Sequence, residues 1–192
     1  RAELLYNTHF ELLIAVILSA QATDKIVNEV TSSLFRKNPD PKSFINCGEK
    51  KLAQLIKRIG LAPTKAKNIL RTCKILIEKH NGSIPNSREA LEQLPGVGRK
   101  TANVVLNVAF GEPTIAVDTH VFRVANRTGL AKGKTVLETE KKLLKITPEK
   151  WKKDAHHYLI LHGRYVCKAK FFDCSTCSII KECQYPLKSK SK

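Results

Sequence analysis

The sequence has few acidic residues, no long apolar run and almost no strand signal. Its 192 residues include 17 Asp and Glu against 34 Lys and Arg, so the formal net charge is +17. This scarcity of acids disfavours a cationic partner and predicts a polyanionic one, either nucleic acid or an anionic membrane surface. A background bias toward Lys, Ile and Asn is the alternative explanation, but the basic residues also cluster around residues 99–100 and among the last cysteines.

The longest apolar run, from Leu12 to Leu18, is too short to span a bilayer. Glu11 precedes the run, and the residues after it lead into another amphipathic helix rather than into the cleavage site of a secreted protein. We therefore interpret this run as a buried core helix and expect no membrane partner. The chain begins at Arg1 without Met, and we expect that its N-terminus has been trimmed.

Apolar residues recur at helical spacing along nearly the whole chain, which predicts an all-α fold. We expect a first lobe of six helices in residues 1–112 and a second helical lobe in residues 113–192, with a groove between them. The expected helices cover about residues 10–20, 24–37, 49–59, 65–80, 87–93 and 99–110, then 118–126, 136–147 and 148–166. The Lys- and Ser-rich tail after Pro186 is predicted to be disordered.

A tight glycine hairpin between two helices is predicted at residues 94–98, LPGVG. Residues 86–89 have the form of a capping box, so a short helix should precede the hairpin. Pro95, Gly96 and Gly98 are unsuited to a helix interior, and the helical apolar pattern resumes directly after them. The unit is therefore a helix, a hairpin and a second helix.

The start of the second helix predicts an anion-binding site. Backbone N–H groups at a helix N-terminus favour phosphate, and glycines let the backbone come close to a ligand. Arg99 and Lys100 occupy the first turn, where cations oppose the helix dipole, so their presence there is explained by an anionic partner. The candidate contacts to a nucleic-acid backbone are Gly96, Val97, Gly98 and Arg99.

Four of the six cysteines lie close together near the end of the chain, at Cys167, Cys174, Cys177 and Cys183. Disulfide frameworks are usual in shorter, more cysteine-rich chains, so we expect a reduced intracellular protein in which Cys47 and Cys73 are ordinary thiols. Four thiolates this close together predict a metal centre. Their spacing has one short pair between two wider gaps, and it leaves a structural zinc ion and a [4Fe–4S] cluster both open.

Three features together resemble the helix-hairpin-helix DNA glycosylases that also act as abasic-site lyases and carry an iron–sulfur cluster. They are the hairpin followed by Lys100, the run TIAVDTHVFRVANR that contains Asp118, and the cysteine spacing. The resemblance extends from Phe10 to Cys183. It implies that the four cysteines hold a [4Fe–4S] cluster with a structural role, and that the groove between the lobes binds DNA.

The same resemblance implies further DNA contacts. Gln21 and Leu61 would enter the duplex and fill the space left by a flipped base. Other contacts are expected from position rather than from the resemblance: His120 lies beside Asp118 and would contact DNA near that base. A loop fixed at both ends by thiolates is stiff, so Lys168 and Lys170, between the first two cysteines, would be held in place to meet phosphates. The ordinary alternatives are a helix-end hydrophobe for the leucine, a structural role for the histidine and a solvated basic loop for the lysines.

The catalytic residues implied by the resemblance are Lys100 and Asp118. An amine nucleophile displaces the base and forms a Schiff base with the opened sugar, after which the 3′ phosphate is expelled. A carboxylate stabilises positive charge on the sugar and assists proton transfers. The alternatives are a phosphate contact for Lys100 and a helix N-cap for Asp118.

We therefore expect a bifunctional DNA glycosylase and AP (apurinic/apyrimidinic) lyase of base excision repair that acts on oxidised pyrimidines. Its expected partner is double-stranded DNA with damaged bases or abasic sites, bound by a monomer in the bacterial cytoplasm, at the nucleoid. Within the family, adenine-DNA glycosylase shares the cluster but lacks the lysine after the hairpin, which disfavours it here. The other alternative is a non-catalytic DNA-binding module with a structural zinc ion, and the combination of Lys100 with Asp118 argues against it.

Overall fold

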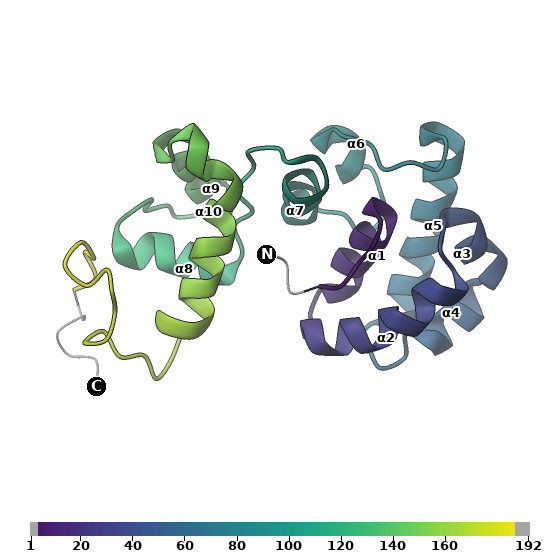
Figure 1. Cartoon of the computed structure of the whole chain (residues 1–192), viewed down its shortest axis with the longest axis horizontal. Coiled ribbons are helices and arrows are strands. Elements are labelled where there is room, and N and C mark those ends of the chain that lie inside the picture. Colours follow the sequence, from purple (N-terminus) through teal and green to yellow (C-terminus); the bar gives the residue numbers. More distant parts are fainter. Residues whose placement is uncertain (1–3, 187–192) are drawn as a thin grey trace. The chain divides into compact units, whose positions relative to one another are not determined.

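Helices make up every regular element of the computed structural model, which describes residues 4–186 (Figure 1). The predicted all-α class is confirmed. The chain divides into two compact units, Arg1–Phe110 and Gly111–Lys192. Across residues 4–186, no helix combines the length and the apolar character needed to cross a membrane. The tail after Pro186, predicted to be disordered, lies outside the described residues.

Seven helices form the described part of the first unit, one more than expected. They are α1 (His9–Ser19), α2 (Asp24–Lys37), α3 (Pro41–Cys47), α4 (Glu49–Leu55), α5 (Ala62–His80), α6 (Arg88–Glu92) and α7 (Arg99–Phe110). The side chains of α1 are buried from Phe10 to Leu18, and this helix packs against α2, α5 and α7. The longest apolar run of the sequence is thus a core helix, as predicted.

The helix that the sequence prediction missed is α3. The sequence NPDP at residues 38–41 favours a simple break between helices, but Pro41 is tolerated in the first turn of a helix, where its missing N–H would have no intrahelical partner anyway. Asp40 caps the helix, because its Oδ1 accepts a hydrogen bond from Ser43 N at 2.8 Å. In return, Asp40 N donates to Ser43 Oγ at 3.1 Å. A reciprocal capping box therefore starts a helix at the predicted break.

The second unit places its helices around a smaller apolar core. They are α8 (Thr119–Thr128), α9 (Val136–Ile146), α10 (Glu149–Leu161) and the π-helix η1 (His162–Val166). The core includes Ile115, Val117, Val121, Ala125 and Leu143. The helix predicted over residues 148–166 is α10 continued by the π-helix η1. This π-helix leads directly into the first of the four clustered cysteines.

Candidate active site and cysteine cluster

The glycine hairpin of the first unit connects α6 to α7 through a tight turn. Val97 N donates to Leu94 O at 3.0 Å, and Thr72 Oγ1 of α5 donates to Pro95 O at 3.1 Å. Gly96 has φ +83°, and an added Cβ would lie 3.4 Å from the Asn68 side chain, so both the backbone conformation and the close packing favour glycine. The hairpin is therefore held rigidly against α5.

The candidate backbone contacts of the hairpin differ in what they can offer a ligand. Gly96 and Gly98 are exposed, whereas the side chain of Val97 is buried in the first unit's core. The side chain of Val97 therefore cannot meet a phosphate, and its N–H already donates to Leu94 O, so the exposed Gly96 and Gly98 offer the more accessible main chain. Arg99 is half-buried and Lys100 is exposed, both in the first turn of α7, which places two cations at the end of the helix that attracts anions.

Gln21 and Leu61 share an unusual backbone conformation. Their φ angles are +57° and +63°, in the left-handed region that residues with a Cβ rarely adopt. Gln21 lies just beyond the end of α1, and Leu61 immediately precedes α5. The Leu61 side chain is 58% exposed, so it is not a hydrophobe folded back onto its helix. Both side chains are exposed at loops of the first unit, which is compatible with insertion into a duplex.

Asp118 is the N-cap residue that precedes α8 in the second unit. Its Oδ1 accepts a hydrogen bond from Val121 N at 2.8 Å, so the N-cap role that was the ordinary alternative is real. The buried residues Ile115 and Val117 fix the segment that leads to it. Because Asp118 and Lys100 belong to different units, their pairing at one catalytic centre stays a prediction.

Arg123, which the sequence analysis missed, connects α8 to the first cysteine. Its Nε donates to Cys167 O at 3.0 Å and its Nη2 donates to Gly163 O at 2.7 Å. The same Nη2 lies 3.2 Å from His120 Nδ1. At Gly163 an added Cβ would lie 2.9 Å from His120 Cβ, so glycine allows η1 to pack closely on α8. His120 is thereby half-buried beside η1 rather than free on a surface.

The structure brings the four clustered cysteines to one cavity. Cys167, Cys174, Cys177 and Cys183 all line it, together with His162 of η1 and apolar side chains. In the described part of the chain, no three His, Cys, Asp or Glu side chains are grouped closely enough to hold a single metal ion. Four thiols spread around a shared cavity are a donor set that fits an iron–sulfur cluster. The four cysteines are consistent with a [4Fe–4S] cluster.

A second unpredicted arginine, Arg127, holds the loop between the first two cysteines. Its guanidinium donates to Lys168 O at 2.7 Å and to Cys167 Sγ at 3.5 Å. It also lies over the rings of Phe172 and Tyr185, 4.3 and 4.9 Å from their centroids. These contacts join both ends of the cysteine segment to α8. Sequence spacing gives no signal for this role, because the partners lie about 40 residues or more further along the chain.

Lys168 and Lys170 project from the loop that Arg127 holds. Both are exposed, as is Phe171 between them, whereas the neighbouring Cys167 is half-buried. The positions of the two lysines are therefore accessible to a polyanion, and their contact with phosphates stays a prediction.

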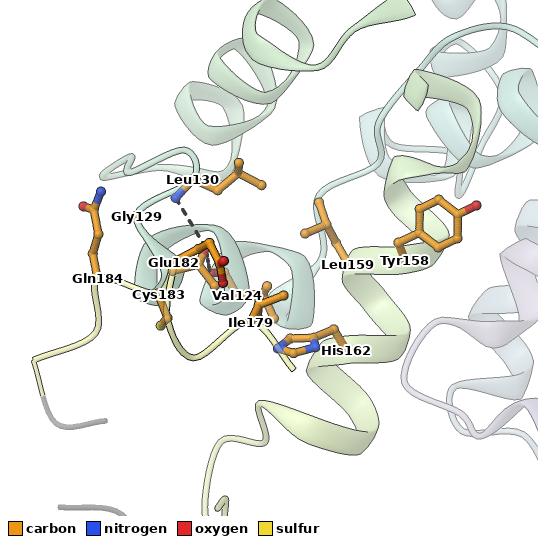
Figure 2. Close-up of a pocket in the computed structure, with 11 residues that line it drawn as sticks. Val124, Gly129, Leu130, Tyr158, Leu159, His162, Ile179, Glu182, Cys183 and Gln184 are labelled. Carbon is orange, nitrogen blue, oxygen red and sulfur yellow. Dashed lines mark hydrogen bonds between the residues drawn. The ribbon is translucent and has the colours of Figure 1, made fainter. Parts of the chain in front are cut away.

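A second cavity of about 470 Å³ adjoins the cysteine cavity in the same unit. Figure 2 shows Leu130, Leu159 and Ile179 around it, from α10 and the loops beside α8. It shares His162 and Cys183 with the cysteine cavity. Burial lowers the pKa of His162, whose Nε2 lies 3.9 Å from Cys177 Sγ, so a neutral imidazole is favoured next to the sulfur donors.

The sequence of this chain matches one family of known proteins and relatives of one kind. Residues 14–149 match the family described as HhH-GPD superfamily base excision DNA repair proteins. The chain is 60% identical to endonuclease III of Haemophilus influenzae and 56% identical to that of Escherichia coli K12. Both alignments span 183 residues, which are 95% of this chain and 87% of each relative.

Two solved structures described as complexes with DNA share the fold. A non-covalent endonuclease III–DNA complex has a TM-score of 0.94 and 48% identity, and the match covers 100% of this chain and 90% of that one. A trapped endonuclease III–DNA covalent intermediate has a TM-score of 0.92 and 49% identity, with 99% and 88% covered.

Proposed function

The chain belongs to the endonuclease III family, within the HhH-GPD superfamily of base excision DNA repair proteins, and we propose that it removes oxidised pyrimidines from duplex DNA and cuts the strand through a Schiff base. It is a DNA glycosylase and AP lyase of base excision repair. The observation that carries the covalent step is Lys100, two residues after the hairpin, in a chain 49% identical to an enzyme trapped covalently on DNA.

DNA binding precedes the chemistry, because a base inside a duplex stack is out of reach of any side chain. The exposed backbone of Gly96 and Gly98, with the cations that begin α7, would hold a phosphate next to the damaged site. Gln21 and Leu61 would fill the gap left by the flipped base, since both are exposed at loop positions. The extrahelical base is then available for chemistry.

The Lys100 amine would attack C1′ of the sugar and displace the damaged base, which leaves as the C1′–N bond breaks. The sugar ring opens to give an imine between Lys100 and C1′. Loss of a proton from C2′ then expels the 3′ phosphate by β-elimination, and water hydrolyses the imine to restore the amine. Asp118 would stabilise the positive charge that develops on the sugar and assist the proton transfers.

The four clustered cysteines would hold the [4Fe–4S] cluster, which when bound supplies a rigid cross-link rather than a redox step. The chain's own contribution is the network around Arg127, which fixes the loop from Cys167 to Cys174. A loop fixed in this way presents Lys168 and Lys170 in one arrangement, so less ordering is required when phosphates bind.

The proposed partner is double-stranded DNA with damaged bases or abasic sites, bound by a monomer. The net charge of +17 and the likeness to two endonuclease III–DNA complexes support DNA as the partner. We place this activity in the bacterial cytoplasm, at the nucleoid, because the relatives come from bacteria and the cysteine cluster needs reduced thiols.

A set of duplexes, each with one defined lesion, tests the proposed substrate class. We expect an oxidised pyrimidine to be released, with strand cleavage, about tenfold or more faster than an oxidised purine or the adenine of a mispair. A duplex with a ready-made abasic site should be cleaved without base release. Preferential release of adenine would instead support the adenine-DNA glycosylase activity, and release without cleavage would remove the lyase from the proposal.

The basic loop of the cysteine segment gives a separate prediction. The double variant Lys168→Ala with Lys170→Ala should keep the visible absorbance of the cluster, while its DNA binding weakens. The slope of log affinity against log salt should become shallower by about 0.9 for each phosphate that the loop no longer neutralises. Cys174→Ser should behave differently and lose absorbance and stability together, because the cluster then lacks one of its four thiolates.

The matched control for this charge removal is Lys141→Ala with Lys145→Ala on α9, which removes two exposed lysines from the same unit. The control should bind DNA with an unchanged salt slope. Equal binding by the loop variant and the parent would mean that the loop only encloses the cluster and that the phosphate contacts lie elsewhere.

A further inference from the structure

Lys65 in the first turn of α5 is buried, with only 5% of its surface exposed. Lysine is almost never buried to this extent unless its ammonium group is paired. Here Nζ donates to Leu18 O at 3.0 Å and to Ala20 O at 2.6 Å. Both carbonyls lie at the C-terminal end of α1, which carries the negative end of the helix dipole and has carbonyls without intrahelical partners. The buried cation is therefore matched to the end of a helix.

The residue next to the bonded carbonyl is Gln21. Lys65 fixes the carbonyl of Ala20, and Gln21 follows directly with its left-handed φ of +57°. Such a conformation in a residue with a Cβ persists only where neighbouring contacts impose it. The ammonium group of Lys65 supplies one of these contacts from a different helix, 45 residues away in sequence.

The main chain of the same lysine contacts Leu61, the other residue proposed to enter the duplex. Lys65 N donates to Leu61 O at 2.9 Å in the first turn of α5, and Leu61, the N-cap of this helix, has φ +63° and makes no side-chain capping bond. Lys65 thus holds the carbonyl that precedes Gln21 through its side chain and the carbonyl of Leu61 through its backbone. Figure 1 shows α1 and α5 within the same unit, where the two helices contact each other, and the Lys65 side chain that joins them is buried.

We propose that Lys65 is a positioning residue that ties the loop of Gln21 to the loop of Leu61, so that both side chains are set for insertion before DNA arrives. The inference rests on the insertion roles proposed above for these two residues. Side chains arranged in advance lose less freedom on binding, and this benefit applies only to DNA that offers a gap to fill. Lys65 should therefore affect the preference for damaged over undamaged duplex.

The test compares the affinity for a duplex with an uncleavable abasic-site analogue with the affinity for an undamaged duplex at one salt concentration. Lys65→Met keeps the length of the side chain and removes its donors, and it should lower this ratio on the order of tenfold. The control is Lys67→Met, an exposed lysine on the same helix with the same change of charge. It should leave the ratio unchanged, even where both affinities fall.

A role limited to capping α1 would be separated by repeating Lys65→Met in a chain that already carries Gln21→Ala and Leu61→Ala. If Lys65 acts through these two side chains, its substitution should cause no further loss of preference in that background. A further loss of the same size would overturn the proposal and leave Lys65 as a helix cap.

Two other outcomes distinguish a failure of the role of Lys65 from a failure of the insertion roles of Gln21 and Leu61. If Gln21→Ala with Leu61→Ala keeps the full preference for the abasic-site analogue, the insertion roles fail and the inference fails with them. If that pair loses the preference but Lys65→Met keeps it, only the positioning role of Lys65 is wrong. Should Lys65→Met not fold, Lys65→Gln retains a donor that reaches less far, and it replaces Met in the same comparison.

Discussion

Replacing Lys100 with glutamine is expected to abolish capture of the protein on damaged DNA by borohydride, which reduces an imine to a stable amine. The covalent route depends on one amine, so strand cleavage should fall by roughly a thousandfold or more. DNA affinity should change far less, because Lys100 is only one of several cations that would meet phosphates. The measurement is the yield of cross-linked protein at saturating DNA, with affinity determined separately on an uncleavable duplex.

The loss of trapping in Lys100→Gln should not result from a loss of folding stability. Lys100 is exposed in the first turn of α7, where its charge opposes the helix dipole, so glutamine should leave the thermal midpoint unchanged or slightly raised. Lys79→Gln, an exposed position in the last turn of α5, is the control and should trap normally. If the Lys100 variant is trapped with the same yield as the parent protein, Lys100 is not the nucleophile and is only a phosphate contact.

Features set by local chemistry could be predicted from the sequence. The helix-hairpin-helix depends on two glycines, a proline and the apolar pattern that resumes after them, all within a short stretch. The core position of α1 follows from its uninterrupted apolar run. The shared cavity of the four cysteines follows from their close spacing, although that spacing did not separate zinc from an iron–sulfur cluster.

Features that depend on chain segments returning to one another could not be predicted. Arg127 lies on α8 in an ordinary helical pattern, and its role appears only when the cysteine segment folds back over it. The sequence pattern predicts Lys65 to be an ordinary basic residue of an amphipathic helix, although it is buried against the end of α1. The π-helix η1 could not be predicted either. Gly163 packs closely on His120 there, and the periodicity of apolar residues gives no information about such packing.

Asp118 combines a structural and a proposed catalytic role, and the structure shows how to separate them. Its Oδ1 caps α8 by accepting the Val121 N–H at 2.8 Å. Asparagine is as good an N-cap as aspartate, so Asp118→Asn should keep most of the stability while it removes the charge. We expect the rate of base release to fall by about a hundredfold to ten-thousandfold in this variant, as for loss of a general acid or base.

Alanine at the same position should remove the cap as well as the charge. Asp118→Ala should therefore lose activity and about 0.5–2 kcal/mol of stability. Thr135→Ala is the matched control, since Thr135 caps α9 in the same unit by accepting the Glu138 N–H at 3.1 Å. It should lose a comparable stability and retain the parental rate. The measurements are single-turnover base release and thermal unfolding. A parental rate in Asp118→Asn would show that the carboxylate is only a cap, and the charge on the sugar would then need another partner.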